Sequence, residues 1–266
     1  MTMNPLLLPT LSLCHRELIR FLRQRNRIIG ALATPIVFWL LIGGGMGRSF
    51  RAEGLPGGTN FIQYFFPGTV LMILLFTAIF STISIIEDRR EGFLQGVLVA
   101  PVPRMAIVLG KVLGGTVLAF GQGLLFLLLA PTVGIRLSAG AVALTLLVML
   151  LVSFALTALG FCLAWRMSST QGFHAIMNLF LMPMWFLSGA LFPADGALGG
   201  LGWIMRLNPL TYGLAALRRA LYWNALPDST TMPSLGLSLA VTVAFAAVML
   251  VLASAIARKT TSADLQ

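Results

Sequence analysis

Charged residues are scarce in this sequence. Only 10% of its 266 residues are Asp, Glu, Lys or Arg, whereas a water-soluble domain has about 25%. Hydrophobic residues make up 58% of the chain, and the mean hydropathy is +0.93. This composition excludes a soluble globular protein. The two cysteines, Cys14 and Cys162, are also too few for a disulfide framework or a cysteine metal cluster.

Motifs for catalysis are lacking as well. No HExxH pattern occurs, and the two histidines, His15 and His174, lie far apart in the chain. The Gly110-Lys111 pair lacks the first glycine and the final Ser or Thr of a phosphate-binding loop. We therefore expect no catalytic residue, no metal, no cofactor and no ATP hydrolysis by this chain alone.

The charged residues are separated by six long uncharged gaps. A helix needs about 20 apolar residues to cross the hydrocarbon layer of a bilayer, and each gap is long enough. The predicted membrane helices cover residues 28–47, 66–86, 112–134, 140–164, 173–192 and 234–257. The expected fold is an all-α polytopic membrane protein that forms a single transmembrane domain over residues 1–266.

These predicted spans contain no acidic or basic residue, and His174 is their one titratable candidate. Transport driven by protons or sodium ions usually needs ionisable or ion-binding positions near the midplane, so this class is disfavoured. The hydroxyl and amide side chains inside the spans either pack the helices together or line a translocation path.

The basic residues predict the orientation. With six spans, both termini lie on one side of the membrane. If that side is the cytoplasm, 12 of the 18 Lys and Arg residues are inside, which the positive-inside rule favours. We therefore expect residues 1–27 and 258–266 to be cytoplasmic. The net charge of +10 is then a topology signal, and no nucleic-acid partner is expected.

Apolar and basic residues recur at helical spacing before the first span. The apolar side carries Leu11, Cys14, Leu18 and Leu22, and the basic side carries Arg16, Arg20, Arg23 and Arg27. The pattern predicts an amphipathic helix along the membrane surface. This helix is either an anchor that sets orientation or, through Arg16, Glu17, Arg20 and Arg23, a docking element for a cytoplasmic partner.

The inner loop between the second and third spans has an unusual pattern. Five consecutive charged residues, 87–91, are expected to end the membrane helix. Phe93, Leu94, Val97 and Leu98 then predict a short helix with an apolar face, which Pro101 and Pro103 stop. A short rigid helix here suits force transmission. The alternative is a solvated charge run with an interfacial helix.

The outer segment 192–233 predicts two short re-entrant half-helices. Asn208 is a good N-cap, and Pro209 occupies the first helical position after it. A leucine stripe opposite Arg218 and Arg219 consists of Leu210, Leu214, Leu217 and Leu221. We expect these half-helices to form part of an outer gate, with Phe192, Pro193, Asn208, Pro209 and Arg218.

The run 90–104, followed by Gly110-Lys111, resembles the signature of the ABC-2 family of ABC transporter permeases. Phe192-Pro193 and Asn208-Pro209-Leu210-Thr211, which leads to Arg218, also match that family. The sequence departs from the family pattern in three places: Phe93 stands where Thr is common, Gln95 where an acid is common, and Pro103 precedes the arginine.

The resemblance implies a permease subunit that pairs with a second membrane subunit, usually a copy of itself, and with two separately encoded ATPase subunits that bind ATP and Mg. It also implies that the surface helix and the coupling helix at 92–101 dock the ATPase. The expected coupling residues are Glu87, Arg90, Glu91, Gly92, Phe93, Leu94, Pro101 and Arg104.

The predicted function is export of hydrophobic or amphipathic, drug-like compounds across a bacterial-type inner membrane. The chain is short and has no appended domain, which is closer to the multidrug and antibiotic-resistance permeases than to other members. One alternative is export of a lipid-linked polysaccharide. Another is a membrane scaffold protein without transport, which an adjacent ATPase gene would argue against.

Overall fold

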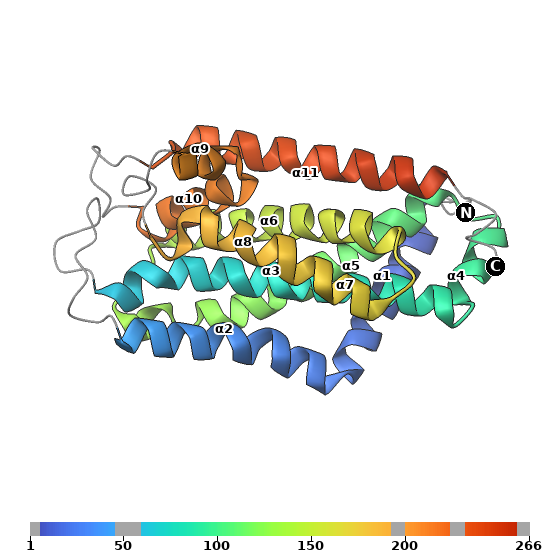
Figure 1. Cartoon of the computed structure of the whole chain (residues 1–266), viewed down its shortest axis with the longest axis horizontal. Coiled ribbons are helices and arrows are strands. Elements are labelled where there is room, and N and C mark those ends of the chain that lie inside the picture. The colour runs from blue at the N-terminus through green and yellow to red at the C-terminus, as the bar shows by residue number, and fades with distance from the viewer. Residues whose placement is uncertain (1–5, 46–59, 193–199, 224–231, 260–266) are drawn as a thin grey trace.

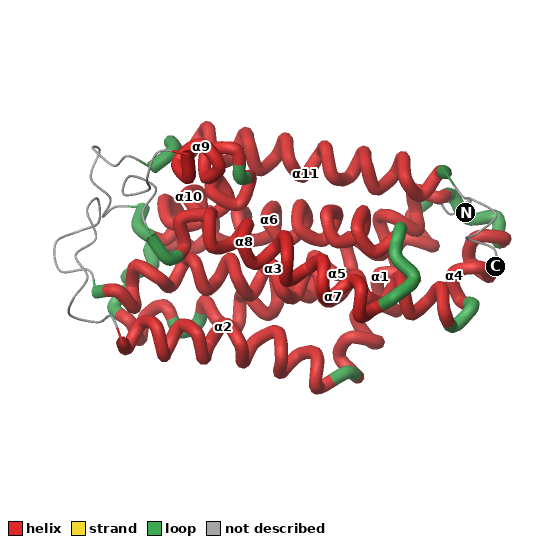
Figure 2. Tube along the Cα trace, viewed as in Figure 1, coloured by secondary structure: helices red, strands yellow, loops and turns green. Residues whose placement is uncertain are grey.

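The computed structural model describes residues 6–45, 60–192, 200–223 and 232–259. All regular structure in these residues is helical (Figure 2), and six helical segments are long and apolar enough to cross a membrane. The segments are α2 (Arg25–Gly45), α3 (Phe61–Arg90), α5 (Arg104–Leu127), α6 (Ala139–Trp165), Thr170–Ala190 and α11 (Leu235–Arg258). The prediction of an all-helical protein with six spans is confirmed.

Helix α3 is the centre of the bundle. It packs against α2, α5 and α6, and 89% of its most apolar 18-residue stretch is buried. In Figure 1, α2 and α11 lie on opposite sides of this centre. Both present large apolar side chains outward, among them Leu41 at 69% exposure and Val251 at 66%. Because a helix satisfies its backbone hydrogen bonds internally, such a surface is compatible with lipid.

Helices outside the six spans lie at the two ends of the bundle (Figure 1). Helices α1 (Leu7–Arg23) and α4 (Phe93–Val99) lie at one end, together with the last turn of α11. Helices α9 (Gly200–Leu207) and α10 (Pro209–Leu221) lie at the other end. The expected surface and coupling helices are therefore on one side and the expected half-helices on the other, as the predicted topology requires.

Two predicted boundaries are wrong, because charged residues were expected to lie outside the helices. The third span begins at Arg104, not at residue 112, and therefore contains Lys111. The second span continues past residue 86 to Arg90 and therefore contains Asp88, although it does end within the 87–91 charge run, as that run predicts. The expectation that no acidic or basic residue lies within a span is thus incorrect. Both side chains are tolerated because they pair with each other.

The fifth span is irregular. It consists of α7 (Thr170–Ile176), a π-helical turn (Met177–Leu181), α8 (Met182–Trp185) and a second π-helical turn (Phe186–Ala190). Gly189 in the last turn has φ of +89°, a conformation that is favourable mainly for glycine. Such turns leave backbone carbonyls available to side chains, and they occur often at functional sites.

Candidate functional site

Helix α1 packs closely on α5 because α5 has glycines at the contact. A Cβ on Gly110 would lie 2.6 Å from Cβ of Leu13, and one on Gly114 would lie 2.8 Å from Cβ of Glu17. The buried face of α1 consists of Thr10, Leu13, Glu17 and Phe21. The predicted apolar side is different, since Leu11 is 55% exposed. Helix α1 therefore has one face against the protein and a second apolar face open to the membrane.

Asp88 is the centre of a charge cluster formed by α1, α3 and α5. Its carboxylate is fully buried and accepts hydrogen bonds from Arg16 Nη1 at 2.9 Å and Arg16 Nη2 at 2.7 Å. Arg20 and Lys111 also donate to it. Lys111 Nζ donates in addition to Glu17 Oε1 at 2.5 Å and to Ser84 Oγ at 3.3 Å. The cluster consists of Arg16, Glu17, Arg20, Glu87, Asp88, Glu91 and Lys111.

This pairing lets charged groups lie in the protein interior. An isolated buried charge is strongly unfavourable, whereas a hydrogen-bonded pair is tolerated. Burial alone would lower the pKa of the Arg16 guanidinium, but its hydrogen bonds to Asp88 and the charge of Asp88 raise that pKa above its ordinary value. The arginine stays charged at every physiological pH. The cluster therefore joins the surface helix permanently to two spanning helices.

Glu87 and Glu91 form the outer edge of the charge cluster. Arg20 Nη2 donates to Glu87 Oε2 at 2.9 Å and to Glu91 Oε1 at 3.0 Å. The Glu91 side chain is 58% exposed, so its ion pair is weakened by solvent. Glu91 is thus accessible to a partner in a way that Asp88 is not.

The predicted coupling residue Arg90 lies outside the charge cluster. Its Nε donates to Ser168 O at 3.0 Å, and Arg89 Nη1 donates to Met167 O at 2.9 Å. Both arginines therefore hold the connection between α6 and α7. Arg104 begins α5, and Arg23 is exposed at the end of α1.

Helix α4 turns away from α3 at Gly92, which has φ of +77°. Leu94 and Leu98 are buried under the helix, and Gln95 Nε2 donates to Arg89 O at 3.2 Å. Pro101 comes two residues after the last residue of α4, Val99, which is 77% exposed. The predicted coupling helix is therefore present, with one apolar face buried and the other open.

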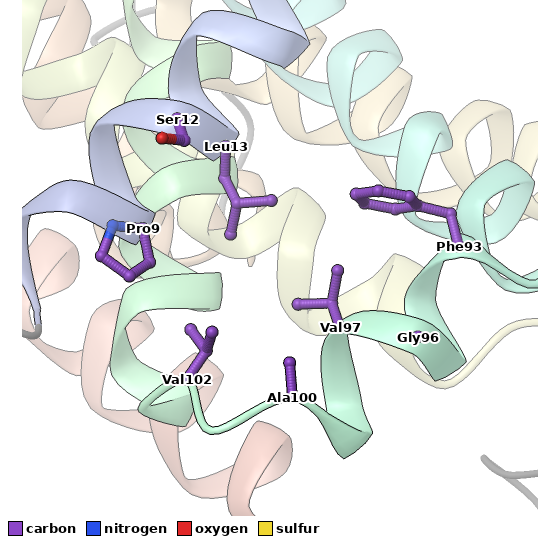
Figure 3. A pocket seen from close by; sticks show the side chains of 8 residues that line it. All are labelled: Pro9, Ser12, Leu13, Phe93, Gly96, Val97, Ala100 and Val102. Carbon is purple, nitrogen blue, oxygen red and sulfur yellow. The ribbon is translucent and has the colours of Figure 1, made fainter.

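An apolar groove of about 350 Å³ lies between α1 and α4 (Figure 3). Its lining residues are Pro9, Ser12, Leu13, Phe93, Gly96, Val97, Ala100 and Val102. The guanidinium carbon of Arg16 lies over the Phe93 ring, 3.6 Å from its centroid. The groove and the charge cluster are therefore adjacent, and Phe93 belongs to the groove while it contacts the cluster.

At the opposite end, Asn208 caps α10 as predicted. Its Oδ1 accepts from the N–H of Leu210 at 3.0 Å, and Pro209 is the first helical residue. Its Nδ2 donates to Met184 O in the irregular fifth span at 2.6 Å. Phe192 is 39% exposed, and the predicted gate residue Pro193 lies outside the described residues.

Arg218 makes a second link between α10 and the fifth span. The leucine stripe of α10 is buried as predicted, but Arg218 is buried too, at 5% exposure. Its Nη2 donates to Gly189 O at 2.9 Å, and its guanidinium carbon lies 4.3 Å from the ring centroid of Tyr64. Tyr64 Oη donates to the same carbonyl at 3.2 Å. The polar end of Arg218 thus satisfies a carbonyl at the positive-φ glycine.

We expect Asn208→Ala to destabilise α10 by about 0.5 to 2 kcal/mol, because the N-cap is lost. It also removes the hydrogen bond to Met184 O. Asn208→Asp is the matched control, since aspartate retains the cap acceptor but cannot donate to that carbonyl. Transport should fall in both variants if the link to the fifth span controls the gate, and only in the alanine variant if the cap alone matters. Unchanged transport in both folded variants would contradict a gating role.

The residues that sequence reasoning missed are Asp88 and Lys111. A signal was present in the spacing Gly110, Lys111 and Gly114, which places two glycines one turn apart on one helix face. Small residues at that spacing allow a second helix to approach closely. A lysine between them then needs an acidic partner, which Glu17 and Asp88 provide.

Comparison with known proteins agrees with this architecture. The family model described as ABC-2 type transporter matches residues 10–222. The chain is similar to the ycf38 transport permease of Cyanophora paradoxa, with 28% identity over 77% of this chain and 71% of that protein. It is also similar to nodulation protein J of Sinorhizobium fredii, with 28% identity over 73% of each chain. The chain therefore belongs to the ABC-2 type transporter family, whose membrane subunits carry no cofactor or ATPase and work with a partner subunit that binds and hydrolyses ATP.

Proposed function

We propose that this chain is the permease subunit of an exporter for hydrophobic or amphipathic compounds in a bacterial-type cytoplasmic membrane. The observation that carries the proposal is the pairing of α1 and α4 at the predicted cytoplasmic end, with a rigid connection from there into α3 and α5. Since the ATPase is a separate subunit in this family, its work must enter through such an element.

The ATPase is proposed to dock on α4 and on the adjacent part of α1. The groove between them offers apolar surface, and exposed Val99 extends that surface on α4. The exposed carboxylate of Glu91, at the end of α3, lies just before α4 in the chain. An apolar side chain of the ATPase would be buried in the groove, while polar contacts form at its edge. The proposal gives two roles to the predicted residues: those in the charge cluster transmit movement, and Phe93, in the groove, contacts the partner. Arg23, Arg90 and Arg104 belong to neither group.

An amphipathic substrate is supported by a second cavity. It has a volume of about 390 Å³ and is lined by residues of α2, α3 and α7 near the predicted cytoplasmic end. Phe80 and Ile83 supply apolar surface. The polar groups come from Asn26, Glu87, Thr170 and His174. A compound with an apolar body and a polar head matches this lining. A lipid-linked polysaccharide, whose lipid also has a polar head, is the second candidate substrate.

A second membrane subunit, most simply another copy of this chain, is proposed to cover the face formed by α2 and the fifth span. Leu179 and Phe180 on the fifth span are 69% and 63% exposed, and Asn178 beside them is exposed too. A polar side chain on a lipid-facing surface is unfavourable, which supports burial of this face against protein.

The test is reconstitution with an ABC ATPase subunit that forms a complex with this chain. We expect proteoliposomes that contain both subunits to accumulate the fluorescent amphiphile Hoechst 33342 when ATP is added outside. Liposomes with a hydrolysis-deficient ATPase are the control for passive partition. Transport of a lipid-linked glycan without transport of the dye would select the second substrate. A stable complex that transports neither would support the scaffold alternative.

A further inference from the structure

Arg16 contacts three elements with one side chain. Its two terminal nitrogens bind both carboxylate oxygens of Asp88 in α3, at 2.7 Å and 2.9 Å. Its guanidinium carbon lies over the Phe93 ring of α4, 3.6 Å from the ring centroid. Arg16 itself belongs to α1. It is therefore the side chain in which the surface helix, a spanning helix and the coupling helix meet.

This geometry needs an arginine and an aromatic ring. A bidentate carboxylate pair fixes the plane of the guanidinium, and the flat face then remains available for stacking. A lysine ammonium is a point charge and has no such plane. A ring attracts a cation placed over its face, which an aliphatic side chain of similar size does not.

The position of the stack gives it a mechanical consequence. Phe93 is the first residue of α4 and also lines the groove toward α1, so its ring stands between the two helices (Figure 3). A displacement of α4 moves the ring, and Arg16 carries that movement to Asp88. Lys111 then connects Asp88 to α5. The stack is therefore on the direct side-chain route from the coupling helix to two spanning helices.

We infer that Arg16 and Phe93 are positioning residues that hold α4 at a fixed distance from α1 and thereby couple partner movement to the spans. The inference rests on the proposed function, because it assigns the residues that transmit the work of the ATPase. It adds a specific chemical requirement: an aromatic face at position 93 opposite the guanidinium at position 16.

A distance measurement tests the positioning without any need for transport. Nitroxide labels go on Leu8→Cys and Val99→Cys, which are exposed sites on α1 and α4 that do not line the groove. The labelled chain lacks its native cysteines. We expect a broader distance distribution in Phe93→Leu, which keeps apolar volume but removes the ring. Phe93→Tyr, which keeps the ring, should retain the wild-type distribution. Equal distributions in Phe93→Leu and wild type would overturn the inference.

A second measurement tests coupling in the complex with the ATPase. Phe93→Leu should lower the substrate transported per ATP hydrolysed by about fivefold, whereas Phe93→Tyr stays close to wild type. The double variant Arg16→Gln/Phe93→Leu should transport as much substrate per ATP as Arg16→Gln alone, since Arg16→Gln already removes the contact between the guanidinium and the ring. Additive losses, or equal losses in Phe93→Leu and Phe93→Tyr, would overturn the inference. If the wild-type complex transports nothing, the proposed function fails, and the nitroxide distances still decide the positioning.

Discussion

Asp88→Ala is expected to lower the free energy of unfolding by about 3 to 5 kcal/mol, because three cations lose the buried carboxylate that they share and Lys111 is left with Glu17 as its carboxylate partner. Asp88 is fully buried and accepts hydrogen bonds from Arg16, Arg20 and Lys111. Lys111, at 4% side-chain exposure, has no access to water that could replace the lost carboxylate. We therefore expect α1 to detach from α3 and α5 and the yield of folded protein to fall sharply.

The measurement is unfolding by SDS in mixed micelles, together with the monodisperse fraction after purification. Glu91→Ala is the matched control, since Glu91 also pairs with Arg20 and follows Asp88 by three residues. Its side chain is 58% exposed, so its loss should change stability by less than about 1 kcal/mol. Equal losses of stability from the two substitutions would show that burial does not decide how strongly a carboxylate of the charge cluster stabilises the protein.

The charge cluster also shows where prediction from sequence stops. Long uncharged gaps identified six spans because an unpaired charge in lipid is unfavourable. That rule placed both Lys111 and Asp88 outside the helices. They lie inside the helices because Asp88 in α3 and Lys111 in α5 neutralise each other. These two residues are 23 positions apart in sequence. Pairing at that separation is a tertiary property, and neither composition nor periodicity records it.

Local signals were more reliable. Asn208 followed by Pro209 predicted the start of α10 correctly, because a cap depends on the capping residue and the first turn alone. Phe93 to Leu98 likewise predicted α4. The irregular fifth span was not predicted, although Pro183 and Gly189 are visible in the sequence. Carbonyls of this span accept hydrogen bonds from residues far away in sequence: Asn208 donates to Met184 O in α8, and Arg218 donates to Gly189 O in the second π-helical turn.

Gly92→Pro is expected to abolish coupling while it leaves membrane insertion intact. Gly92 has φ of +77°, whereas proline fixes φ near −65°, so the turn between α3 and α4 cannot form. Proline also removes the N–H that donates to Arg89 O at 3.3 Å. Without that turn, Phe93 cannot reach Arg16, and α4 loses its place beside α1. The contact to Arg89 O lies in the last turn of α3, at the end of the span, so insertion should proceed.

Gly96 provides the matched control because it lies in the same short helix. An added Cβ at Gly96 meets nothing within 4 Å, and Gly96→Ala should stabilise α4 slightly, by about 0.5 to 1 kcal/mol. The effect of Gly92→Ala on the turn and on α4 should lie between those of Gly92→Pro and Gly96→Ala, because a left-handed conformation is unfavourable by roughly 1 to 2 kcal/mol for alanine. We expect transport per ATP to fall about tenfold or more in Gly92→Ala and to vanish in Gly92→Pro. Gly96→Ala is the control for the stability of α4 and not for transport, because its methyl group enters the groove between α1 and α4. Coupled transport by Gly92→Pro would exclude α4 as the element through which ATP hydrolysis drives the spans.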